Sequence, residues 1–108
     1  MKDLIQKHCV PCEGGTPPLD PQVVEKLLPQ VPEWEVIENN RLIRRTFKFK
    51  NFLEAMKFVN KVAEIAEVEQ HHPDVDIHYN KVTLTFWTHA IGGLSENDFI
   101  VAVKIDQL

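Results

Sequence analysis

Hydrophobic residues along this 108-residue chain recur with helical spacing in three segments. The first predicted helix follows Asp20-Pro21, a typical N-cap and first-turn pair, and a later proline ends it. The second begins after Asn51 and keeps an i, i+3, i+4, i+7 spacing until Pro73 stops it. The third follows Ser95, which has the capping-box spacing with Asp98. The apolar stripes comprise Val23, Val24, Leu27 and Leu28; Phe52, Ala55, Met56, Val59, Val62, Ala63 and Ala66; and Phe99, Ile100 and Val103.

Alternation of apolar and polar residues predicts four strands, which pair as two hairpins. Residues 34–38 and 42–49 flank Asn39-Asn40, a pair that tolerates positive φ and suits a two-residue turn. Residues 75–79 and 82–88 flank Asn80-Lys81 in the same way. Each hairpin is expected to have one apolar face, formed by Ile43, Phe47 and Phe49 in the first and by Val82, Leu84 and Phe86 in the second.

The order helix, hairpin, helix, hairpin, helix predicts an α+β fold. A four-stranded antiparallel sheet with three helices packed on one face is the simplest arrangement that buries every apolar stripe. The length suits a single domain spanning residues 1–108, and prolines and glycines make residues 1–18 an irregular N-terminal arm. The uncovered sheet face and the strand edges favour assembly into oligomers.

Composition and charge narrow the class of protein. The chain has 44% hydrophobic and 26% charged residues, as ordinary globular proteins do. Its 12 Lys and Arg against 16 Asp and Glu give a net charge of -4, which argues against binding to a nucleic-acid backbone. The opening residues, MKDLIQKHCVPC, contain no apolar run long enough for a signal peptide or a membrane span. We therefore expect a cytosolic protein that does not associate with membranes.

The only two cysteines, Cys9 and Cys12, form a CxxC motif next to His8. A structural zinc site needs four ligands at paired spacing, and the sequence has no second CxxC or HxxxH. A redox CxxC normally opens a helix after a strand, whereas this motif lies in a segment rich in Pro and Gly. A packed or solvated arm is favoured, and metal or redox chemistry is the alternative.

Three of the five histidines are candidates for chemistry. His71 and His72 are expected at a helix end where the chain bends into proline, so both rings can approach one cavity. His89 ends the fourth strand, on the same side as Trp87 if the strand stays regular. Imidazole has an ordinary pKa of about 6.5, so it exchanges protons readily at neutral pH. His8 and His78 are interpreted as surface or capping residues.

Two carboxylates accompany these histidines. Glu67 lies four residues before His71, one helical turn away, and can face the same site, although a solvated helix carboxylate is the simpler interpretation. Asp98 can act at the site, as the capping partner of Ser95, or in both roles.

The available side chains favour proton transfer over other chemistry. The sequence contains no convincing activated nucleophile and no Gly-rich phosphate loop. Elimination of water needs a proton delivered to a leaving hydroxyl and another removed from a neighbouring atom, which two imidazoles can do. A metal site is the competing hypothesis, but the rings of adjacent His71 and His72 diverge unless the backbone distorts.

The spacing of these residues is similar to a known signature, that of the pterin-4a-carbinolamine dehydratases. It is Glu67-x3-His71-His72-Pro73-x5-Tyr79-x9-His89-x8-Asp98. The leading CVPCEGG also resembles the N-terminal arm of many non-animal members, so the resemblance covers nearly the whole chain. It implies dehydration of 4a-hydroxytetrahydrobiopterin, or a related 4a-hydroxytetrahydropterin, to the quinonoid dihydropterin. It also implies a homodimer or homotetramer with neither a metal nor a redox cofactor, the pterin being the substrate.

The same resemblance implies a role for each matched residue. His71 and His89 would be the acid–base pair, His72 would bind and orient the pterin, and Glu67 would tune the charge of His71. Pro73 would fix the bend, and Thr88 and Asp98 would support the site or contact the pterin. Two alternatives are a pterin-binding module without catalysis and a dimerisation cofactor of a transcription factor, a second role that animal members of this family have.

Overall fold

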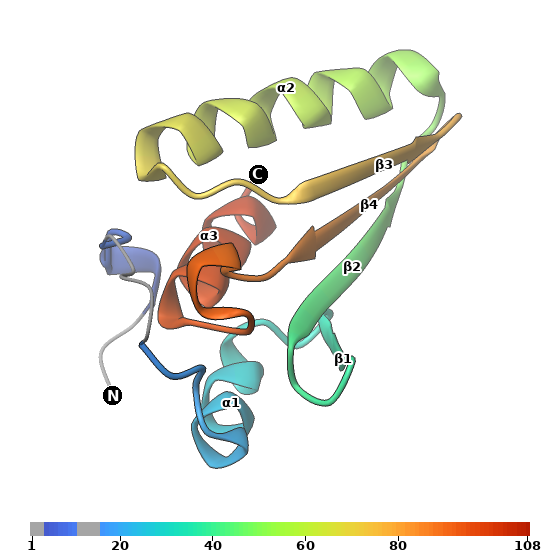
Figure 1. Cartoon of the computed structure of the whole chain (residues 1–108). Helices are drawn as coiled ribbons and strands as arrows, with labels where there is room; N and C mark the ends of the chain where they lie inside the picture. The colour runs from blue at the N-terminus through green and yellow to red at the C-terminus, as the bar shows by residue number, and fades with distance from the viewer. Residues whose placement is uncertain (1–3, 11–15) are drawn as a thin grey trace.

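A computed structural model describes residues 4–10 and 16–108 and confirms the predicted α+β fold (Figure 1). The strands form one antiparallel sheet in the order β1-β2-β4-β3. The helices and strands are α1 (Pro21–Leu27), β1 (Glu35–Ile37), β2 (Leu42–Lys48), α2 (Phe52–Glu69), β3 (Asp74–His78), β4 (Lys81–Phe86) and α3 (Glu96–Asp106). Within the described residues, short 3-10 turns accompany them: η1 (Leu4–Gln6), η2 (Leu28–Gln30) and η3 (His89–Ile91).

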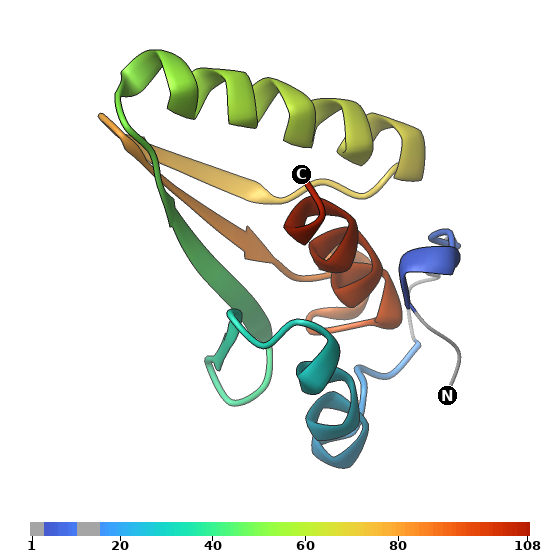
Figure 2. The ribbon, with the colours of Figure 1, turned by 180° about the vertical axis from the view of Figure 1, so that it is seen from behind.

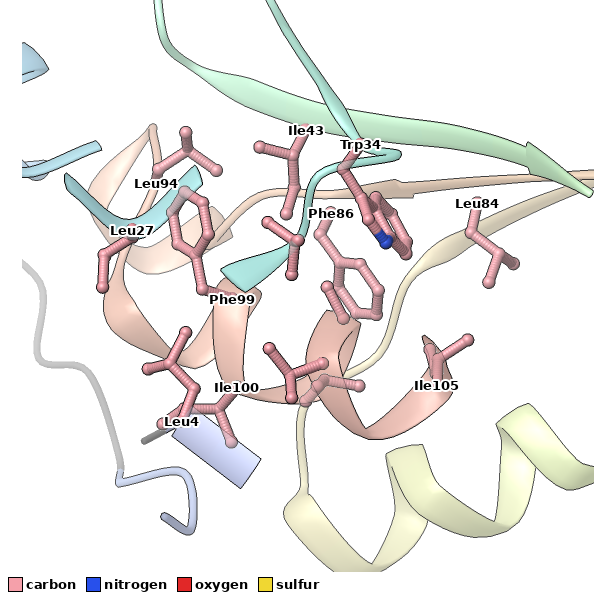
Figure 3. Close-up of a cluster of buried hydrophobic side chains, with 14 of the residues drawn as sticks. Leu4, Leu27, Trp34, Ile43, Leu84, Phe86, Leu94, Phe99, Ile100 and Ile105 are labelled. Atoms are coloured by element: carbon pink, nitrogen blue, oxygen red, sulfur yellow. The ribbon is translucent and has the colours of Figure 1, made fainter. Parts of the chain in front are cut away.

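Helix α3 occupies the centre of the core. Figures 1 and 2 show it between α1 and α2, with the sheet on one side and η1 on the other. This position explains why α3 is apolar around most of its circumference, since a helix covered on all sides has no face for solvent. The buried side chains around it include Leu4, Leu27, Trp34, Ile43, Leu84, Phe86, Leu94, Phe99, Ile100 and Ile105 (Figure 3).

Strand β4 alternates as predicted, whereas all five residues of β3 are exposed, and both hairpin turns differ from the prediction. On β4, Val82, Leu84 and Phe86 are buried, and these side chains form the inner face of the sheet. In the first hairpin Ile37 pairs with Leu42, so the loop has four residues, and three of them have positive φ. The predicted two-residue Asn-Asn turn is therefore wrong. The second hairpin has a two-residue turn one position earlier than expected, formed by residues 79–80.

Helix α2 begins as predicted but ends early. The side chain of Asn51 accepts a hydrogen bond from the backbone N–H of Glu54, which caps the first turn. The helix ends at Glu69 because Gln70 adopts a left-handed conformation with φ of 52°. The expectation that Pro73 stops the helix is wrong, and His71 lies beyond the helix rather than in its last turn.

The described part of the N-terminal arm is packed on the domain. It contains one 3-10 turn rather than only irregular chain, and the side chain of Leu4 is completely buried. Cys12, the second cysteine of the CxxC motif, lies outside the described residues. Within the described ranges, no helix has both the length and the apolar character that crossing a membrane requires.

Candidate active site

The first side chain of the site, His71, is fixed by the turn that follows α2. The backbone N–H of His71 donates to the carbonyl oxygen of Ala66, at 3.1 Å, so the chain folds back against the helix end. The imidazole lies parallel to the ring of Phe86, with 5.9 Å between centroids and 9° between planes. Only 12% of the His71 side chain is exposed. The left-handed turn thus directs this ring inward, toward α3.

His71 forms a hydrogen-bonded pair with Asp98, in the first turn of α3. Its Nε2 atom donates to Oδ1 of Asp98 across 2.6 Å, and the Asp98 side chain has no exposure to solvent. A buried carboxylate must be satisfied by hydrogen bonds to be tolerated. The other oxygen, Oδ2, accepts the hydroxyl of Thr88 and the backbone N–H of Ser95, each at 2.9 Å. The capping box predicted for Ser95 is confirmed, and its Asp98 carboxylate also contacts the histidine.

His89 lies in the segment that follows β4 and lines the same pocket region as His71. Its ring stacks on Trp87, with centroids 3.9 Å apart. The expectation that His89 ends the fourth strand is wrong, because β4 ends at Phe86 and His89 begins η3. The loop behind it is held by a hydrogen bond from the N–H of Thr88 to the carbonyl of Gly93, at 2.8 Å. A Cβ at Gly93 would lie 2.9 Å from the Cβ of Pro18, so only glycine fits this close approach.

A pocket of about 490 Å³ brings His71, Thr88 and His89 together. Two of the three candidate histidines therefore line one cavity, whereas the expectation that His72 shares this cavity with His71 is wrong. The pocket is lined by Cys9, Val10, Val68, Glu69, Gln70, His71, Thr88, His89, Ala90 and Asn97. This volume lies within the range of small-molecule sites, which is about 300–1,000 Å³.

His72 and Glu67 are placed differently from the prediction. Nε2 of His72 donates to Oε2 of Glu67 across 2.5 Å, and both side chains are largely exposed. The expected pairing of Glu67 with His71 is wrong, because α2 ends before the turn that would have aligned them. Pro73 joins this segment to β3 and is half-buried. Neither His72 nor Pro73 lines the 490 Å³ pocket.

The arm contributes a thiol to the pocket. Burial, and to a lesser degree the nearby Glu69 and Asp98 carboxylates, raise the pKa of Cys9 to about 12. The thiol therefore stays neutral at ordinary pH, unlike the activated thiolates of redox and nucleophilic cysteines. Among the described residues, no group of three or more His, Cys, Asp or Glu side chains is arranged to hold a metal ion.

Sequence reasoning missed three polar residues that line the pocket, Glu69, Gln70 and Asn97. One signal could have indicated Glu69, because it continues the buried stripe of Val62 and Ala66 at helical spacing. A carboxylate on the buried face of a helix normally has a specific partner. No comparable signal marks Asn97, which looks like an ordinary polar residue in a first helical turn.

His71, paired with the buried carboxylate of Asp98, and His89 line one pocket on an α+β scaffold, and a pocket of this size with a few polar side chains is typical of a small-molecule site. The family profile for pterin 4 alpha carbinolamine dehydratase matches residues 17–108. The chain belongs to the pterin 4 alpha carbinolamine dehydratase family, and the resemblance inferred from its sequence is confirmed.

Full-length relatives support this assignment. A protein of Rubrobacter xylanophilus is 48% identical over 108 residues, which cover all of both chains. A protein of Halorhodospira halophila is 51% identical, covering 97% of this chain and 96% of its own. A third, from Legionella pneumophila strain Corby, is 52% identical, with 98% and 95% covered. All three carry the provisional name pterin-4-alpha-carbinolamine dehydratase.

Two solved structures share the fold. A transcriptional coactivator/pterin dehydratase from Brucella melitensis superposes with a TM-score of 0.79 and 32% identity, covering 83% of this chain and 96% of that one. A pterin dehydratase-like protein identified as a RuBisCO assembly factor in the alpha-carboxysome has a TM-score of 0.61 and 18% identity, covering 69% and 87%. The second likeness concerns the fold alone.

Proposed function

We propose that this protein removes water from 4a-hydroxytetrahydrobiopterin, or from a related 4a-hydroxytetrahydropterin, to give the quinonoid dihydropterin. Membership of the pterin 4 alpha carbinolamine dehydratase family supports this substrate class and reaction. The observation that carries the proposal is the position of His71 and His89 on one pocket of about 490 Å³. The physiological role would be recycling of the tetrahydropterin cofactor used by aromatic amino-acid hydroxylases.

The reaction needs two proton transfers. The C4a–O bond breaks as the departing hydroxyl gains a proton, and a ring N–H loses a proton as a C=N bond forms. Two imidazoles can supply and accept these protons near neutral pH. We assign the two transfers to His71 and His89 as a pair.

The Asp98 carboxylate would act through His71 rather than on the substrate. Because Nε2 of His71 donates to Asp98, the Nδ1 atom is left to exchange a proton with a ligand. A buried carboxylate in this position fixes the tautomer and the orientation of the ring. Thr88 would hold that carboxylate in place through its hydroxyl.

The exposed residues beside the pocket would contribute to binding. His72 would orient the pterin at the rim, and Glu67 would hold the ring of His72 through their hydrogen bond. Pro73 would fix the direction of the chain between His72 and β3. These roles predict effects on substrate affinity rather than on the proton transfers.

We also propose that the protein is a cytosolic homodimer or homotetramer. Strand β3 lies at an edge of the sheet, and all five of its residues are exposed, including Val75 and Ile77. An unpaired edge strand with exposed apolar side chains favours self-association. Sedimentation equilibrium should show two or four chains, and a monomer at micromolar concentration would contradict this assembly.

Stopped-flow decay of a 4a-hydroxytetrahydropterin, with and without the protein, tests the activity. We expect decay to accelerate in proportion to protein concentration. A protein that binds the pterin but leaves decay at its spontaneous rate would instead be a binding module. A protein with neither property would contradict the substrate assignment.

A further inference from the structure

The N-terminal arm, defined here as residues 4–10, forms part of the pocket wall. Cys9 and Val10 line the same cavity as His71 and His89, although they precede them by more than 60 residues. Figures 1 and 2 show the arm running beside α3, on the side away from the sheet. The site is thus closed on one side by a segment that belongs to neither the sheet nor the main helices.

The beginning of the arm is anchored by residues that do not line the pocket. The side chain of Leu4 is completely buried, and its backbone N–H donates to Oε1 of Gln30 across 3.0 Å. Lys7 forms an ion pair of 2.7 Å with Glu96, in the first turn of α3. These contacts hold the arm on the domain before it reaches the cavity.

Glu69 fixes the part of the arm that enters the pocket. Its side chain is only 4% exposed, and its Oε1 accepts the backbone N–H of Cys9 at 2.8 Å. Its Oε2 lies 2.9 Å from Nδ1 of His8 and 3.9 Å from Nζ of Lys104. Glu69 is the last residue of α2, and it lies two residues before His71 in the sequence.

Asn97 holds the next residue at both of its backbone polar groups. Its Oδ1 accepts the N–H of Val10 at 3.1 Å, and its Nδ2 donates to the carbonyl of Val10 at 2.6 Å. The amide therefore pairs with the backbone as a neighbouring strand would. Asn97 directly precedes Asp98, so each member of the His71–Asp98 pair has an arm anchor within two residues of it in the sequence.

We propose that Cys9 and Val10 form a substrate-binding wall of the active site, and that Glu69 and Asn97 are positioning residues that hold this wall. The proposal rests on the proposed function, because it takes the ligand of the pocket to be a pterin. Val10 is 66% exposed and Val68, also on the pocket, is 76% exposed. Two exposed apolar side chains on a pocket gain burial when a flat ring covers them. The arm therefore contributes to affinity for the ring and not to proton transfer.

Val10→Glu is the most direct test, because Val10 is largely exposed and its hydrogen bonds to Asn97 are made by the backbone. We expect KM to rise about tenfold while kcat stays within about twofold, since the lost contact exists equally before and during reaction. Asn97→Ala should also raise KM, by about threefold or more, by releasing the backbone of Val10. Ile5→Glu is the matched control, because Ile5 is exposed on the same arm and does not line the pocket.

Binding of oxidised biopterin, followed through quenching of the intrinsic fluorescence of Trp34 and Trp87, gives a second readout that needs no turnover. The expected result is a weaker affinity for Val10→Glu and an unchanged affinity for Ile5→Glu. Equal affinities in wild type and Val10→Glu would overturn the arm proposal even if the wild type is an active dehydratase. A wild type that binds biopterin in an arm-dependent manner but does not accelerate dehydration would overturn the proposed activity and leave the arm proposal standing. Circular dichroism of each variant verifies its fold.

Discussion

Nε2 of His71 lies 2.6 Å from Oδ1 of Asp98, a carboxylate with no solvent exposure that also closes the capping box of α3. One side chain thus both begins the central helix and orients a pocket histidine. Replacement of Asp98 should therefore affect stability and activity together, and the two effects can be separated by measurement.

Asp98→Asn tests this relationship. The amide keeps the size of the side chain but cannot accept at both atoms, so the His71 ring loses its fixed orientation. We expect kcat to fall on the order of 10²-fold, within the range of acid–base effects. Unfolding in urea should show a loss of about 1–3 kcal/mol, because a buried donor is left unpaired. An unchanged kcat in a folded variant would contradict the role of Asp98.

Glu67→Gln tests whether the two neighbouring histidines, His71 and His72, have different roles. Glu67 contacts His72 and not His71, so its replacement should raise KM modestly, by about threefold or less, and leave kcat unchanged. His72→Ala should raise KM further, again with little effect on kcat. Steady-state kinetics of both variants check this, and a large fall in kcat for Glu67→Gln would show that Glu67 acts on the proton transfers after all.

The stability that the docked arm gives to the fold should depend on pH, because Glu69 holds the arm as a carboxylate. Burial alone would raise the pKa of Glu69, but hydrogen bonds from Cys9 and His8 and the charge of Lys104 outweigh it, so the pKa is lowered. A carboxyl whose folded pKa is depressed stabilises the fold above its unfolded value of about 4.3, and this contribution is lost as pH falls through the lower folded value.

Urea unfolding between pH 7 and pH 3 measures this contribution. The wild type should lose more stability below about pH 4.3 than Glu69→Gln, which has no charge to lose at this position. Glu64→Gln, an exposed change on the same helix, should follow the wild type. Parallel curves for wild type and Glu69→Gln would contradict the arm anchor.

The contacts of Asp106 indicate that its replacement should lower stability without affecting the pocket. Its carboxylate accepts the indole N–H of Trp34 at 2.9 Å and pairs with Nη1 of Arg45 at 2.7 Å. Asp106→Ala would leave both donors partly buried without this partner. We expect about 1–3 kcal/mol of destabilisation in urea unfolding with kcat unchanged. A change below about 0.5 kcal/mol would contradict this assignment.

The fold was predictable because its signals are local and consistent. Alternation along β4 and the apolar stripe of α2 define which faces are buried. The N-cap Asn51 and the capping-box spacing of Ser95 define where α2 and α3 begin. The first hairpin turn was not predictable in the same way. Its positive φ values extend to Glu38, and side-chain type alone does not indicate a left-handed glutamate.

The sequence predicted His71 and His89 as pocket residues, but it predicted neither the position of His72 nor the partner of His71. The shared pocket of His71 and His89 follows from the signature spacing, but the partner of His71 depends on where α2 ends. That end is set by a left-handed Gln70 rather than by Pro73, and the difference moves Glu67 to His72. The arm anchors depend on contacts between residues that lie 60 and 87 positions apart, for which no local pattern exists.

The most direct test of the account is the rate of 4a-hydroxytetrahydropterin dehydration by the His71→Ala/His89→Ala double variant, measured by stopped flow beside the wild type. If the two imidazoles on the shared pocket perform the proton transfers, each single variant should lose on the order of 10²-fold in kcat and the double variant should approach the spontaneous rate. A folded double variant with full dehydratase activity would contradict the account.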